Sequence, residues 1–191
     1  PETVMAQLNQ HSRHLDKNLQ RMILIHQETG MRISELCALK YDCLSKDSDS
    51  DYFVKFFISK VNKENNIPVS QDTANLILEQ QAMVIKEFER HELLFPMPHH
   101  VMQMNGKLKK SKNDSIGKQW LRKTITNQLN NLARKYNICA PSGEIWFFDT
   151  HSFRHTTATR MINNGTPQHI VQKFLGHETP TMTSRYAHIH D

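Results

Sequence analysis

The sequence predicts a mixed α+β domain that is mainly helical and carries one small antiparallel β-sheet. Apolar residues recur at helical spacing over most of the 191 residues, which is the pattern of helices that bury one face. An aromatic and β-branched run over 52–58 and a shorter one over 67–69 supply the strands. The length suits one well-packed domain and is short for two.

The chain opens with helices. Within 4–28, apolar residues at helical spacing predict two helices, and Gly30 is placed to end the second of them. Helical spacing resumes after this glycine and runs from Ile33 to Leu39. The part of the chain before the sheet is therefore expected to be helical.

The sheet follows an acidic segment. Residues 47–51 alternate aspartate and serine and read as a solvated turn that leads into the strand over 52–58. The two asparagines at 65–66 predict a turn before the strand over 67–69, whose proline suits an edge position. The resulting antiparallel sheet is expected to carry Lys60 near its hairpin.

Helical signals return after the sheet. The spacing of apolar residues predicts a helix from 70 to about 90 and a second amphipathic helix from 116 to about 136. Between them, residues 98–115 have weak periodicity and several lysines. We expect this segment to be an exposed loop or hairpin.

The last part of the chain is predicted to be a series of short helices. One extends over 150–165, with Thr150 as its cap, and a second opens at Pro167 and ends at Gly176. The Thr-Pro pair at 179–180 opens a third, which carries Tyr186. These helices bring polar side chains that bear on function.

Composition limits the possible settings of the protein. The formal net charge of +5 suits a polyanionic partner, although basic proteins without one are equally common. The cysteines Cys37, Cys43 and Cys139 are odd in number and lack C-x-x-C spacing, so we expect reduced thiols in the cytoplasm. No apolar run approaches the roughly 20 residues that span a membrane. Because the chain begins with Pro1 and shows no signal peptide, it is expected to be an excised fragment.

The order of Arg32, His151, Arg154, His177 and Tyr186 indicates chemistry on a phosphodiester. Such a reaction needs neutralisation of the phosphate oxygens, an in-line nucleophile and a proton for the leaving oxygen. The planar fork of arginine meets two phosphate oxygens and keeps its charge. A tyrosine hydroxyl, with a free pKa near 10, becomes nucleophilic where cations favour its phenolate and a histidine accepts its proton.

This order resembles the tyrosine recombinase (phage integrase) family. The family has an Arg in a Gly-x-Arg-x-x-Glu run, a Lys on a β-hairpin, His-x-x-Arg, Leu-Gly-His and a Tyr. The matching residues here are Arg32, Lys60, His151 with Arg154, His177 and Tyr186. By this resemblance Arg32 and Arg154 form an arginine clamp on the phosphate, and Glu35 orients it. The resemblance covers the whole chain and implies that 1–191 is the C-terminal catalytic domain, without the N-terminal DNA-binding domain.

The resemblance also implies a general acid, the lysine that protonates the 5′-oxygen leaving group. Lys60 takes the first-lysine position of the family's Gly-Lys-Gly-x-Lys pattern and is the preferred candidate. Ser59 and Val61 replace the glycines of that pattern, and Lys63 is the alternative acid, or else a DNA contact.

The function implied is site-specific DNA recombination of the integrase or transposase kind, through a 3′-phosphotyrosyl intermediate. The implied partner is double-stranded DNA, bound by a homotetramer of the full-length protein in the bacterial cytosol. Neither a cofactor nor a metal is expected, since the covalent link conserves the phosphodiester energy. His151 and His155 have the i, i+4 spacing of two zinc ligands on a helix. No glutamate follows the first histidine, and Arg154 between them would repel a cation, so the pair is not expected to bind a metal.

Two other functions fit parts of the pattern. A type IB topoisomerase shares the chemistry but rejoins the same strand, and a catalytically silent DNA-binding or regulatory domain would have no need of Tyr186. Four further lysines are candidate DNA contacts or else belong to a solvated loop. They are Lys107, Lys109, Lys110 and Lys112.

Overall fold

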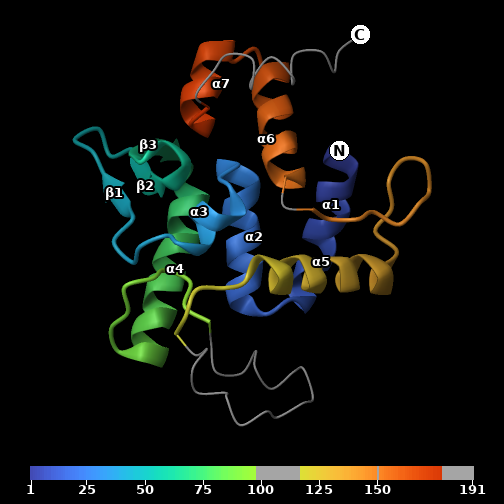
Figure 1. The fold of residues 1–191 in the computed structure, drawn as a ribbon, viewed down its shortest axis with the longest axis horizontal. Helices are drawn as coiled ribbons and strands as arrows, with labels where there is room; N and C mark the ends of the chain where they lie inside the picture. Colours follow the sequence, from blue (N-terminus) through green and yellow to red (C-terminus); the bar gives the residue numbers. More distant parts are fainter. Residues whose placement is uncertain (98–116, 150, 178–191) are drawn as a thin grey trace.

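The computed structural model describes residues 1–97, 117–149 and 151–177 and confirms a mainly helical α+β domain with a small sheet (Figure 1). The helices are α1 (Glu2–His11), α2 (Lys17–Thr29), α3 (Ile33–Cys37), α4 (Gln71–Phe88), α5 (Arg122–Tyr136), α6 (Ser152–Asn163) and α7 (Gln168–Leu175), with short 3₁₀ turns η1 (Ser12–His14) and η2 (Ser59–Val61). The strands are β1 (Leu44–Lys46), β2 (Tyr52–Ile58) and β3 (Lys63–Val69). Among the described residues, no helix has the length and apolarity needed to cross a membrane.

Helix α2 is central to the core and determines where the site lies. It contacts α4 and α6 (Figure 1). Its residues Leu19, Met22 and Ile23 are fully buried. The predicted end at Gly30 is confirmed, since this glycine has a φ of 58° in the left-handed region. A Cβ at this position would lie 3.0 Å from both Leu175 and Thr157 side chains. The glycine therefore lets the end of α2 approach α6 and α7 closely.

The sheet has the strand order β1-β2-β3 and is antiparallel throughout. Strand β3 lies at an edge, as its proline predicts. The predicted turn at 65–66 is wrong, because Asn65 and Asn66 pair with Phe56 and Lys55 inside the β2–β3 ladder. The turn falls earlier, over η2, and Asn62 closes it with a φ of 50°. Lys60 consequently lies in the hairpin turn itself.

Two further details of the sheet and helices differ from expectation. Strand β1 was not predicted, because its three residues are half-buried or exposed and show no apolar pattern. Helix α5 begins at Arg122 rather than near 116, because Gln119 forms a β-bridge with Pro96 and Trp120 is buried in the core. Residues 119–121 therefore precede the helix instead of forming its first turn.

Helix α6 has His151 as its N-cap residue, and Asp149 fixes this end of the helix. Asp149 Oδ1 accepts hydrogen bonds from the backbone N–H groups of His151 and Ser152 at 2.7 Å each. The predicted cap, Thr150, lies outside the described residues, as do the predicted loop at 98–115 and the predicted helix that carries Tyr186. The end of α7 at Gly176 is confirmed by its φ of 63°.

A buried histidine connects α2 to α6. His26 is fully buried, and its ring lies 4.7 Å from that of Phe153. A carbonyl can only accept, so Nε2 carries the proton that is donated to the Met31 oxygen at 2.8 Å. The buried Nδ1 has no hydrogen-bond partner among the residues that the structure describes. Burial lowers the pKa of His26 to about 4, and the charges of Arg154 and His151 act in the same direction.

We expect the domain to lose stability as the pH falls from about 6.5 to about 4. In this window an unfolded histidine binds a proton and the folded His26 does not, so the unfolded state gains stability on acidification. At about 1.4 kcal/mol per pKa unit, the loss from this one group approaches about 3 kcal/mol. Urea denaturation at a series of pH values measures it. His26→Gln keeps a donor but takes up no proton, so its pH dependence should be weaker, and equal dependence in both proteins would contradict the assignment.

Candidate active site

Arg32 is held at the start of α3 by a carboxylate one turn later. Glu35 Oε1 accepts from Arg32 Nη1 at 2.7 Å, and Oε2 accepts from the Arg32 backbone N–H at 2.8 Å. The Glu35 side chain is 3% exposed and that of Arg32 is 20% exposed. A buried carboxylate thus fixes both the backbone and the side chain of Arg32, while part of the guanidinium still faces the solvent.

Arg154 lies in the first turns of α6 and is almost fully buried. Its Nη1 donates to the carbonyl of Gly30 at 3.0 Å, and its Nη2 donates to the carbonyl of Leu175. These carbonyls belong to the ends of α2 and α7, where backbone oxygens lack helical partners. Arg154 therefore joins α6 to the ends of α2 and α7, which lie two residues before Arg32 and His177 along the chain.

His177 directly follows the left-handed Gly176, and its backbone N–H donates to the Gln172 carbonyl at 2.9 Å. Burial lowers the pKa of His177 to about 4, and the positive charges of Arg154, Arg32 and Lys60 act in the same direction. The imidazole is therefore neutral near pH 7. A neutral imidazole can donate one hydrogen bond and accept a proton, which suits it to serve a phosphate oxygen or a tyrosine hydroxyl.

Both candidate lysines lie at the hairpin beside His177. Lys60 is exposed in η2, and its charge lowers the pKa of His177. Lys63 is exposed at the start of β3 and, together with His177, lines a cavity of about 470 Å³ between the hairpin and α7. The structure thus brings both lysines to the same side of the site.

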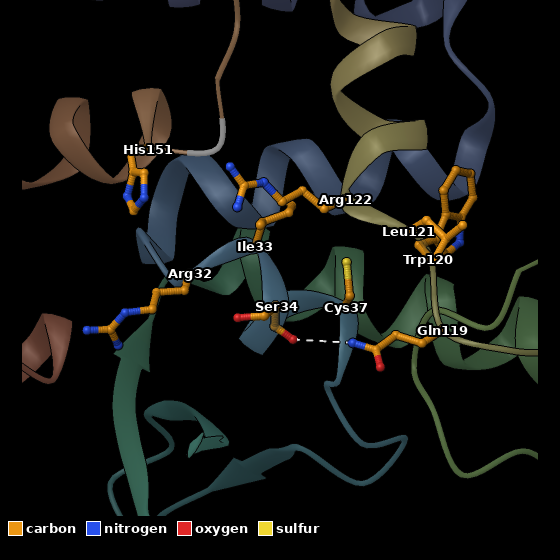
Figure 2. A pocket seen from close by; sticks show the side chains of 9 residues that line it. All are labelled: Arg32, Ile33, Ser34, Cys37, Gln119, Trp120, Leu121, Arg122 and His151. Carbon is orange, nitrogen blue, oxygen red and sulfur yellow. Dashed lines mark hydrogen bonds between the residues drawn. The ribbon is translucent and has the colours of Figure 1, made fainter. Parts of the chain in front are cut away.

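A second cavity, of about 390 Å³, lies beside Arg32. Its lining includes a basic residue, Arg122, that the sequence analysis did not single out. Figure 2 shows the His151 side chain projecting from the start of α6 and lying above Arg32. The guanidinium of Arg122 points toward His151. Arg122 is exposed at the first position of α5, where the helix dipole disfavours a positive charge. That unfavourable placement is the signal by which the sequence could have revealed it.

The structure thus brings together Arg32, His151, Arg154 and His177, with the Lys60 hairpin next to them. Their catalytic roles remain predictions. Tyr186 lies outside the described residues, and so do the four lysines between 107 and 112. Among the described residues, no group of three histidine, cysteine or acidic side chains could hold a metal ion.

The fold is that of the tyrosine recombinase class. Residues 1–191 match the phage integrase family, and the chain belongs to that family. The resemblance inferred from the sequence is therefore confirmed.

The relatives with similar sequences are recombination proteins. Transposase B from transposon Tn554 of Staphylococcus aureus is 49% identical over 190 residues, which are 100% of this chain and 28% of that transposase. A tyrosine recombinase XerC from Halalkalibacterium halodurans is 27% identical over 162 residues, or 84% of this chain and 46% of that protein. The chain therefore spans less than half the length of these relatives.

Solved structures confirm the fold. The XerA recombinase superposes with a TM-score of 0.73 at 19% identity, over 100% of this chain and 60% of that chain. The XerH site-specific recombinase bound to its difH substrate gives a TM-score of 0.69 at 17% identity, over 96% of this chain and 48% of that chain.

Proposed function

We propose that this chain is the catalytic domain of a site-specific DNA recombinase that serves the transposition of a mobile element. The observation that carries the proposal is the meeting of Arg32, Arg154 and His177 at one place, from three separate elements, in a chain of the phage integrase family. The Tn554 transposase, at 49% identity, supports the transposition role. All the relatives and structures compared above are recombination proteins, which favours recombination over a topoisomerase.

The proposed reaction transfers one DNA strand to the enzyme. Arg32 and Arg154 neutralise the non-bridging oxygens of the phosphate, and His177 and His151 donate hydrogen bonds to it. The hydroxyl of Tyr186 gives its proton to a neighbouring histidine and bonds to phosphorus as the bond to the 5′-oxygen breaks. The Lys60 ammonium gives that oxygen its proton. A 5′-hydroxyl of a partner strand then reverses these steps and releases Tyr186.

The proposed partner is double-stranded DNA, bound by the full-length protein as a tetramer in the bacterial cytoplasm. In this proposal a DNA-binding domain precedes the present chain and completes the grip on the duplex. XerH bound to its difH substrate supports the DNA partner, and a lambda integrase tetramer bound to a Holliday junction supports the tetramer. The net charge of +5 suits such a partner.

The test is a covalent complex between protein and DNA. Full-length protein is incubated with a duplex that is built from the joined ends of the element and nicked just beyond the scissile phosphate. The short fragment that carries the new 5′-hydroxyl then diffuses away, and its loss traps the intermediate. We expect a denaturant-resistant, protease-sensitive adduct in which the protein is linked to the new 3′-phosphate end, and strand exchange when two intact sites are supplied. Relaxation of supercoiled plasmid without exchanged products would instead identify a topoisomerase. The absence of any adduct would contradict both functions.

Arg122 gives a prediction about binding. DNA affinity should fall steeply with salt, because phosphate contacts dominate it. Arg122→Ala should weaken binding to all DNA sequences alike. It should also reduce the slope of log K against log salt concentration by about 1, which is the contribution of one phosphate contact. The measurement is fluorescence anisotropy of labelled duplex over a salt series. Arg134→Ala is the matched control, since Arg134 is exposed near the other end of the same helix and donates to Asn131 at 2.9 Å. An equal change in both variants would remove Arg122 from the site.

A further inference from the structure

The last turn of α7 is held by two side chains from different parts of the fold. The carbonyl of Phe174 accepts a hydrogen bond from Asn65 Nδ2 at 3.2 Å, and the next carbonyl, of Leu175, accepts one from Arg154. The chain then turns at Gly176 into His177. One short segment thus connects the Lys60 hairpin on one side with the arginine clamp on the other.

Asn65 belongs to the same rigid unit as the hairpin turn. It pairs with Phe56 in the β2–β3 ladder, and the ladder ends at the pair formed by Ile58 and Lys63, directly before η2. In a strand, alternate residues share a face, so Asn65 lies on the same face of β3 as Lys63. A displacement of Asn65 relative to α7 would therefore move the hairpin turn with it.

The hairpin also contacts α7 at Gly176. A Cβ at this glycine would overlap with Cδ1 of Ile58, so the Ile58 side chain packs directly against the backbone of Gly176. By contrast, the apolar face of α7 packs on α6, in a small cluster of Ala158, Val171 and Leu175. The contact between α7 and the hairpin thus includes the packing of Ile58 on Gly176 and the hydrogen bond of the Asn65 amide.

We propose that Asn65 is a positioning residue, which fixes the Lys60 hairpin against the His177 segment so that Lys60 reaches the leaving oxygen. This inference rests on the proposed recombinase reaction. A proton donor must come within about 2.6–3.2 Å of its acceptor, and a displacement of 1 Å can cost about 10²-fold in rate. Asn65 itself does not touch the reacting atoms. Its removal should therefore act on one step, the protonation of the leaving group.

The test compares two versions of the nicked substrate in the full-length protein. One has the ordinary 5′-oxygen at the cleaved bond, and the other has sulfur in its place, which leaves as a thiolate and needs no proton. Asn65→Ala should slow cleavage of the oxygen substrate by about 10-fold or more, up to about 10²-fold. With the sulfur substrate its rate should return to that of the unmodified protein.

Asn66→Ala is the matched control, because Asn66 is the same residue type in the next position of β3 and is exposed. It should cleave both substrates at the normal rate. Equal slowing of Asn65→Ala on both substrates would show a general structural role and overturn the inference, as would no slowing on either. Failure of the unmodified protein to form an adduct with either substrate would instead overturn the proposed function, and this inference with it.

Discussion

Replacing Tyr186 with phenylalanine should abolish the covalent protein–DNA complex while leaving DNA binding intact. The substitution removes the one oxygen that is proposed to bond to phosphorus. It leaves in place the side chains that are proposed to bind the phosphate and to protonate the leaving group. Gel electrophoresis under denaturing conditions, with the nicked substrate labelled at the retained strand, measures the adduct. Fluorescence anisotropy with the intact duplex measures binding.

The chain supplies its own controls, because it contains only three other tyrosines, Tyr41, Tyr52 and Tyr136. The ring of Tyr136 stacks on the rings of His11 and His14, with 4.6 Å between the centroids in each pair, which is a packing role. Phenylalanine at any of these three positions should leave the adduct in place. A normal adduct in Tyr186→Phe, or its loss in one of the other variants, would move the nucleophile to another residue.

The sequence predicts well those features that depend on neighbouring residues. Gly30 and Gly176 end their helices because a left-handed φ is nearly free of strain only for glycine. The aromatic run of β2 forms a strand because alternate residues reach the core. In each case the deciding interactions span only a few positions along the chain.

Features that depend on distant contacts were missed or misplaced. The asparagines at 65–66 have the composition of a turn, but strand pairing with β2 outweighs that preference, and Asn65 reaches Phe174, which is 109 positions away. Likewise, the bond from Arg154 to the Gly30 carbonyl joins residues 124 positions apart. No local pattern contains either contact.

The candidate site shows the same division. Arg32, His151, Arg154 and His177 were found because they match a family pattern of residue types and spacing, and this pattern stands in for the missing long-range information. Arg122 was not found, because it belongs to no such pattern and joins the cavity only through the packing of α5. The local signal for Arg122 is a positive charge in the first turn of a helix, where the helix dipole disfavours it.

Lys60→Ala should slow strand cleavage by about 10²–10⁴-fold, the usual cost of losing a general acid. The exchange of sulfur for the 5′-oxygen should then restore most of the rate, because the thiolate leaves without a proton. The comparison of single-turnover rates on the two substrates isolates proton donation from phosphate binding, which both substrates need equally. Arg154→Ala, which loses charge at the phosphate, should therefore be slow on both.

The same pair of substrates decides between the two hairpin lysines, which the structure places together beside His177. Lys60 lies in the turn, and its charge already acts on that histidine, whereas Lys63 is fixed in the ladder opposite Ile58. We therefore expect Lys63→Ala to lose DNA affinity and to show no gain from sulfur. If Lys63→Ala is the variant that sulfur rescues, Lys63 is the acid and Lys60 the DNA contact. If sulfur rescues neither, the proton comes from another group, and the role assigned to the hairpin is wrong.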